Sequence, residues 1–120
     1  MMKLIAELDT DQAGRPLSIK AGGAEHFSIA LKVKGASDNV QRVRYVLDPS
    51  YPNKVRTVPA RIPEFEEPIT SYGDYVIKVE YEEAGLTKSF TRLLSQALED
   101  GLAESTSPDV RSAIDQIKKY

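Results

Sequence analysis

Cysteine is absent from this 120-residue chain, and histidine occurs once, as His26. The lack of cysteine excludes a disulfide scaffold, a thiol nucleophile and any cysteine-ligated metal or iron–sulfur site. A single histidine excludes multi-histidine metal sites and paired histidines for acid–base chemistry. The sequence therefore predicts no metal site and no cofactor.

Neither an excess of basic charge nor a long apolar run is present. The 16 basic and 18 acidic residues give a formal net charge of −2, which argues against a general polyanion binder. No apolar run approaches the ~18–20 residues of a membrane span. Residues 1–7 (MMKLIAE) acquire an acid too early for a signal peptide. We predict a soluble, cytoplasmic, single-domain protein with neither nucleic acid nor membrane as partner.

Alternation of apolar and polar residues is the dominant pattern along the chain. It is clearest over residues 27–33, 43–47 and 75–81, and weaker over residues 3–8, 17–20, 54–58 and 86–93. This period of two is typical of half-buried strands, and glycine and proline separate the segments. Pro59, Pro63 and Pro68 should keep the stretch around them out of a central strand. Because no alternation of strands with helices is present, the pattern favours an antiparallel β-sandwich or barrel.

The pattern changes at the C-terminal end. Ser107, Pro108 and Asp109 form a helix-start signal, and apolar residues follow at helical spacing, which predicts a helix over residues 108–119. Residues 95–100 fit a shorter helix that ends at Gly101. The sequence thus divides into a sandwich over residues 1–94 and a helical appendage over residues 95–120. The appendage should pack by Ile114 and Ile117 on its own sandwich or on a partner chain, where it could form oligomer contacts.

The residues that commonly perform catalysis do not converge in this sequence. His26 fits a surface or loop-packing role, and no serine has another candidate base. Neighbouring acids such as Glu66 and Glu67 would point to opposite faces of an extended chain. Gly22-Gly23 lacks the spacing of a phosphate-binding loop. We therefore predict a protein that is not an enzyme and has no catalytic residues.

Two segments together resemble a known family. Residues 43–56 read VRYVLDPSYPNKVR, and residues 71–79 read SYGDYVIKV. This pair, in this order, resembles the YEATS domain and in particular its prokaryotic branch (pYEATS). In that family a strand ends in a loop of the form L-H-x-S/T-F-x-x-P-x-R, and a later G-W-G-E-F turn opens another strand.

The resemblance implies an immunoglobulin-like antiparallel β-sandwich with no catalytic activity. Eukaryotic members read acylated lysines, which they hold between aromatic rings of these two loops. By this resemblance, Ser50 would supply a hydroxyl to the acyl amide, and Tyr51 and Tyr72 would supply the rings. Gly73 would keep the second turn narrow, and Tyr75 would replace a core phenylalanine. If Tyr51 and Tyr72 form one slot, their ring centroids should lie about 4.5–7 Å apart.

The sequence also departs from the family pattern. Asp48 stands where histone readers have a histidine, Tyr72 replaces a tryptophan, and Ser71 replaces a glycine. In the prokaryotic branch the resemblance implies sensing or adaptor work in conflict and defence systems. Asp48, Ser50, Tyr51, Tyr72 and Gly73 are therefore the candidate ligand-binding residues.

Each candidate also has a purely structural interpretation. Tyr51 and Tyr72 could cap the end of the sandwich, while Asp48 and Ser50 could cap their own turn. Arg56 could pair with an acid across the sheet. Two functions follow: a module that recognises a peptide, an acylated side chain or a partner protein, or a structural protein that assembles through its sheet edge and C-terminal helix. Arg42 and Arg44 should lie on an exposed strand face that binds no nucleic acid tightly.

Overall fold

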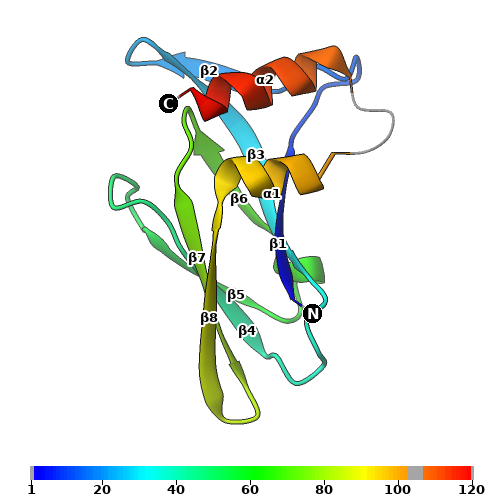
Figure 1. The fold of residues 1–120 in the computed structure, drawn as a ribbon, viewed down its shortest axis with the longest axis vertical. Helices are drawn as coiled ribbons and strands as arrows, with labels where there is room; N and C mark the ends of the chain where they lie inside the picture. Colours follow the sequence, from blue (N-terminus) through cyan, green and yellow to red (C-terminus); the bar gives the residue numbers. More distant parts are fainter. Residues whose placement is uncertain (1, 103–106, 120) are drawn as a thin grey trace.

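Two antiparallel sheets make up most of the computed structural model, which describes residues 2–102 and 107–119 (Figure 1). The first sheet contains β1 (Lys3–Leu8), β2 (Ser18–Ala21), β3 (Ala24–Lys34) and β6 (Glu67–Ser71). The second has the order β5 (Val55–Pro59), β4 (Arg42–Val46), β7 (Val76–Glu83) and β8 (Leu86–Leu93). A short 3-10 helix, η1 (Pro63–Phe65), precedes β6, and the chain ends with α1 (Leu94–Asp100) and α2 (Pro108–Lys118).

All seven strands expected from the sequence are present, so the predicted antiparallel architecture is confirmed. The strand that sequence reasoning missed is β6, which contains Pro68. β6 pairs with β3 alone. Proline is tolerated there because an edge strand leaves one side of its backbone without a ladder partner. The expectation that the prolines avoid a central strand is therefore compatible with the additional strand.

The alternating pattern produces the core. In β4 the side chains of Val43 and Tyr45 are fully buried, while Arg42 and Arg44 are exposed on the opposite face, as predicted. Val43 pairs with Val58 of β5 on one side and with Tyr81 of β7 on the other. The Tyr45 hydroxyl donates a hydrogen bond of 2.7 Å to the Phe65 carbonyl, so this buried polar group is satisfied.

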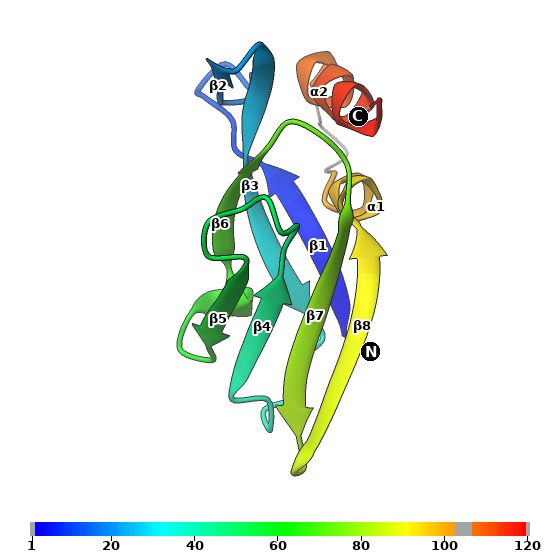
Figure 2. The ribbon, with the colours of Figure 1, turned by 90° about the vertical axis from the view of Figure 1, so that its left-hand side faces the viewer.

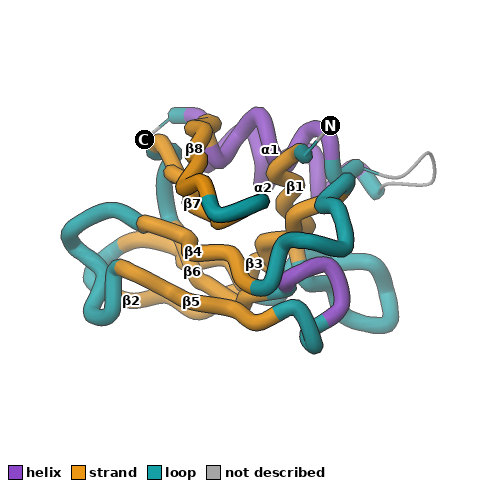
Figure 3. Tube along the Cα trace, turned by 90° about the horizontal axis from the view of Figure 1, so that it is seen from below, coloured by secondary structure: helices purple, strands orange, loops and turns teal. Residues whose placement is uncertain are grey.

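Helix α1 covers the gap between two sheet edges. It contacts β1 of the first sheet and β8 of the second, and both helices gather on this side of the molecule (Figure 3). The buried face of α1 consists of Leu94, Ala97 and Leu98, which confirms the apolar face expected for a helix here. Arg92 joins the two edges directly, because its guanidinium donates to the Leu4 carbonyl at 2.8 Å.

The C-terminal end of α1 lies against β1. Asp100 forms ion pairs with Lys3, at 2.8 Å, and with Arg92, and these two cations hold the pKa of Asp100 below its ordinary value of 3.8. Gly101 ends the helix as predicted, but with φ −84 it is right-handed and does not use the left-handed conformation that usually favours glycine. Glycine is needed there for a different reason: a Cβ on residue 101 would lie 2.0 Å from the Ala6 carbonyl oxygen.

Helix α2 packs within its own chain. Ser107 caps it as expected, accepting a hydrogen bond from the Val110 amide, and its hydroxyl also donates to the Gly14 carbonyl at 2.8 Å. Ala113, Ile114 and Ile117 are buried in the same cluster as the sandwich core. The boundary proposed between residues 94 and 95 lies at the junction of β8 and α1, and the division into two parts stays a prediction. Within the described residues, neither helix is long and apolar enough to span a membrane.

Replacing Ile117 by alanine should lower the free energy of unfolding by about 2–5 kcal/mol, because the side chain is fully buried and its loss leaves a cavity. Ile19 is 65% exposed, so Ile19→Ala should change the free energy of unfolding by no more than about 0.5 kcal/mol. Urea denaturation of both variants measures the difference. Equal stability of the two would mean that α2 does not pack on the core in solution.

Gly101→Ala should destabilise the protein by about 2–3 kcal/mol, because the new methyl group would overlap the Ala6 carbonyl and force α1 away from β1. Gly22→Ala is the comparison, since a Cβ there meets nothing within 4 Å and only the φ of +59 opposes it. Its effect should be smaller, about 1 kcal/mol. If the two thermal midpoints fall equally, the close approach of α1 to β1 is wrong.

Candidate functional site

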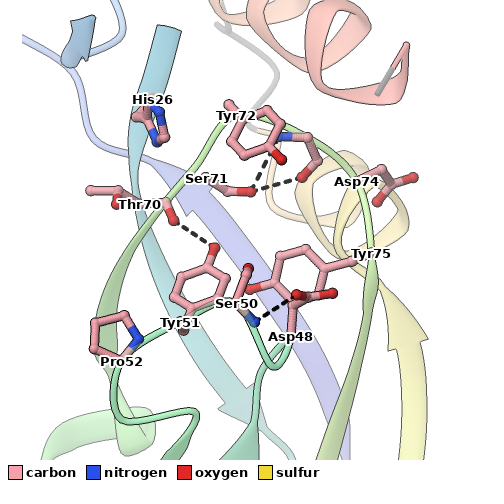
Figure 4. A pocket seen from close by; sticks show the side chains of 11 residues that line it. His26, Asp48, Ser50, Tyr51, Pro52, Thr70, Ser71, Tyr72, Asp74 and Tyr75 are labelled. Carbon is pink, nitrogen blue, oxygen red and sulfur yellow. Dashed lines mark hydrogen bonds between the residues drawn. The ribbon is translucent and has the colours of Figure 1, made fainter. Parts of the chain in front are cut away.

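A pocket of about 400 Å³ opens between the β4–β5 loop and the β6–β7 loop. The β6–β7 loop arches at the end of the sandwich where α2 lies (Figure 2). The first loop supplies Asp48, Ser50, Tyr51 and Pro52; the end of β6 and the following loop supply residues 70–75; and β3 supplies His26 (Figure 4). The structure thus brings all five predicted ligand-binding residues, Asp48, Ser50, Tyr51, Tyr72 and Gly73, to one pocket.

The β4–β5 loop is held by a tight turn. A carboxylate oxygen of Asp48 accepts a hydrogen bond of 2.9 Å from the Ser50 amide, and the Asp48 carbonyl accepts one of 3.0 Å from the Tyr51 amide. The structural interpretation of Asp48 as a turn cap is therefore right. The Ser50 amide, followed by the Ser50 hydroxyl, lowers the pKa of Asp48 below 3.8. Asp48 is consequently a carboxylate at neutral pH.

The β6–β7 loop is fastened at both ends. The Ser71 hydroxyl is buried, donates to the Gly73 carbonyl at 2.7 Å and accepts from the Gly73 amide at 3.3 Å. The two carboxylate oxygens of Asp74 accept hydrogen bonds from the amide and hydroxyl of Ser95, at 2.9 and 2.6 Å. These bonds satisfy a backbone donor in the first turn of α1. The second pocket loop is therefore anchored to the helix that covers the sheet edges.

Aromatic rings form much of the pocket wall. The rings of Tyr51 and Tyr75 lie 5.6 Å apart, and those of Tyr72 and His26 meet edge to face at 5.2 Å. The Tyr51 hydroxyl donates to the Thr70 carbonyl at 2.6 Å, so it connects the β4–β5 loop to the end of β6 (Figure 4). Tyr72 is 49% exposed. The direct contact expected between the Tyr51 and Tyr72 rings stays a prediction.

Tyr75 has an unusual environment. Its ring packs against the core, as the resemblance implied, yet the residue also lines the pocket. Its hydroxyl is buried and has no hydrogen-bond partner in the part of the chain that the structure describes. Burial, and secondarily the neighbouring Tyr51, raises the pKa of Tyr75 far above its ordinary value of 10.0. The hydroxyl is therefore neutral at physiological pH.

Sequence reasoning missed His26 as a pocket residue. The surface or loop-packing role expected for His26 agrees with the contact of its ring with Tyr72 of the β6–β7 loop, but the side chain also lines the pocket. The pairing of Phe27 with Ser71 places this part of β3 beside the second loop. No local sequence signal could have shown this, because the two strands are far apart in the chain. Arg56, in contrast, pairs with Glu67 at 2.9 Å, as the structural interpretation expected.

The pocket lining contains two acidic residues, Asp48 and Asp74, and no lysine or arginine. Within residues 2–102 and 107–119, no group of three or more histidine and acidic side chains could hold a metal ion. The pocket therefore offers ring faces, hydroxyl groups and negative charge to a ligand.

The sequence model of the prokaryotic YEATS domain family matches residues 26–90 of this chain. The chain belongs to the prokaryotic YEATS domain family. The match covers more than half of the 120 residues and includes both pocket loops and His26. The resemblance inferred from residues 43–56 and 71–79 is thereby confirmed.

Solved structures of YEATS domains have the same fold. The chain is similar to the Yaf9 YEATS domain recognising an H3K122suc peptide, at 16% identity over 93% of this chain and 87% of that chain, with a TM-score of 0.57. The Yaf9 YEATS domain bound to H3K27ac is 19% identical over 78% of this chain and 73% of that chain, with a TM-score of 0.53. The yeast AF-9 homolog Yaf9 is 23% identical over 76% and 65% of the two chains, also with a TM-score of 0.53.

These likenesses confirm the immunoglobulin-like β-sandwich predicted for the chain. A comparison with curated proteins gave no match.

Replacing Tyr75 by phenylalanine should raise the free energy of unfolding by up to about 1–3 kcal/mol, because it removes a buried hydroxyl that lacks a partner. Tyr45→Phe removes the same atom where it is hydrogen-bonded, and should lower the free energy of unfolding by about 0.5–1.5 kcal/mol. Denaturant titration of the two variants gives opposite signs if the pocket geometry is right. A loss of stability in Tyr75→Phe would show that its hydroxyl has a partner in solution.

Proposed function

We propose that this chain is a non-catalytic binding module that takes an acylated lysine side chain of a protein or peptide into the pocket between its two loops. One observation carries the proposal: Ser50 and Tyr51 of the β4–β5 loop and Tyr72 of the β6–β7 loop line one pocket. Peptide recognition by related folds supports it, since the Yaf9 YEATS domain is described as recognising an H3K122suc peptide and as bound to H3K27ac.

The residues have distinct roles in this proposal. The rings of Tyr51 and Tyr72 provide flat apolar surfaces on which a planar acyl group stacks. The Ser50 hydroxyl hydrogen-bonds the acyl amide. Gly73 is buried in the pocket wall and carries no side chain, so it lets a ligand approach the backbone of the second loop. The hydrogen bond that Ser71 donates to Gly73 and those that Asp74 accepts from Ser95 hold this loop in place before a ligand arrives.

The competing proposal is a structural protein that assembles through its sheet edge and C-terminal helix. That function needs an apolar helix face for the partner, but Ala113, Ile114 and Ile117 of α2 are buried within the chain. A structural role for the pocket aromatics would also favour buried rings, whereas Tyr72 is 49% exposed. The binding module accounts for both features.

The remaining parts of the proposal concern the setting. We propose a cytoplasmic module that binds neither nucleic acid nor a metal or other cofactor. Arg44 pairs with Glu80 at 3.6 Å, which reduces the positive charge of the exposed β4 face. A place in a bacterial conflict system is part of the same proposal, and an effector encoded beside the gene would support it.

Tyr72→Ala should weaken binding of an acyl-lysine peptide by at least about tenfold, because it removes a ring that contacts the ligand. Stability should change little, since the residue is 49% exposed. Isothermal titration with acetyl-lysine, crotonyl-lysine and unmodified forms of one peptide measures the effect.

Leu86→Ala is the matched control, because Leu86 is 62% exposed and lies at the start of β8, outside the pocket lining. It should bind as the parent chain does. If the parent chain binds the acylated forms no better than the unmodified peptide, the proposed function is wrong.

A further inference from the structure

The pocket is lined by acidic residues but by no lysine or arginine. The acidic residues are Asp48 and Asp74. Both carboxylate oxygens of Asp74 are engaged by Ser95 of α1, so Asp74 serves the loop anchor. These uncharged donors leave Asp74 charged, so both acids give the pocket negative charge; Asp48 is the one whose carboxylate acts on Tyr75 in the pocket wall.

The charge of Asp48 is not neutralised by a cation. Its hydrogen bonds come from the uncharged groups of Ser50, and no ion pair reaches it within the described residues. Arg56, whose positive charge also acts on Tyr75 of the pocket wall, pairs with Glu67 at 2.9 Å. The field of Asp48 extends to the pocket wall, because the carboxylate contributes to the raised pKa of Tyr75, after the larger effects of burial and Tyr51. Figure 4 shows the Asp48 carboxylate beside the ring of Tyr75.

A ligand that carries a negative charge would therefore meet repulsion from Asp48, which the weaker effect of Arg56 at the same pocket wall offsets only in part. Asp48 is only partly buried, so water screens this repulsion in part, and it acts over short distances. An uncharged acyl group has no such penalty. We infer that the pocket selects its ligand by charge, accepting an uncharged acyl-lysine and rejecting one whose acyl chain ends in a carboxylate, with Asp48 as the selecting residue. This inference rests on the proposed function.

The YEATS fold itself does not forbid an acidic acyl group. The Yaf9 YEATS domain has a solved structure described as recognising an H3K122suc peptide, in which the lysine carries a succinyl group. The selection thus belongs to the residues that this chain places around its own pocket. Asp48 is the residue at which charge can be removed without altering the turn, since an asparagine oxygen can still accept the hydrogen bond from the Ser50 amide.

The experiment compares acetyl-lysine and succinyl-lysine forms of one peptide by isothermal titration. The parent chain should bind the succinyl form at least about tenfold more weakly than the acetyl form. Asp48→Asn should reduce this difference to about threefold or less, mainly by strengthening succinyl binding. Asp38→Asn removes the same charge from the exposed β3–β4 loop and should leave the difference unchanged. The Yaf9 YEATS domain serves as the positive control for the succinyl peptide.

Salt provides a second measurement on the parent chain. Added salt screens repulsion between exposed charges, so it should strengthen succinyl binding relative to acetyl binding. This result remains decisive if Asp48→Asn fails to fold.

The outcomes separate the two proposals. Equal affinity of the parent chain for both acyl peptides, or a difference that neither Asp48→Asn nor salt alters, overturns charge selection and leaves the proposed function standing. Failure to bind the acetyl peptide better than the unmodified one overturns the proposed function, and charge selection falls with it.

Discussion

The cover that α1 provides over the gap between β1 and β8 is the constraint on which the rest of the structure depends. A sandwich leaves open strand edges, and these need protection from water and from pairing with other chains. Leu94 and Leu98 bury apolar surface at this gap, and Gly101 permits the helix to approach the β1 backbone. Helix α2 then packs on the same side, which completes the core.

The candidate site depends on α1 because one of its loops is hydrogen-bonded to that helix. Asp74 satisfies donors at the start of α1, so the β6–β7 loop takes its position from the helix as well as from its strands. The β4–β5 loop is stabilised locally by the Asp48 turn, and the Tyr51 hydroxyl connects it to Thr70. A pocket held in this way is largely formed before a ligand arrives, which reduces the ordering that binding must impose.

The fold could be predicted from the sequence wherever the pattern of apolar and polar residues matches the burial that those residues have in the folded protein. β4 and the first half of β7 alternate because one face lies on the core, and most of β3 follows the same pattern. Ser107-Pro108-Asp109 marks the start of α2 by capping chemistry alone. The prediction failed for β6, because Pro68 is compatible with a strand only at an edge and the sequence does not say which strands are edges. For Gly101 the predicted helix end was right, while the reason lay in a contact with a residue distant in sequence.

The candidate site shows the same division. The sequence by itself determined the two loops, the turn at Asp48 and the aromatic residues beside it, since these follow from short motifs whose hydrogen bonds are local. Only the tertiary structure decided that His26 meets Tyr72 and that the Tyr75 hydroxyl is buried without a described partner. It also decided that Asp74 is hydrogen-bonded to α1, while the bonds of Asp48 stay within its own loop. These features depend on strand pairing and helix packing between distant segments, and such contacts leave no trace in the residues next to them in the chain.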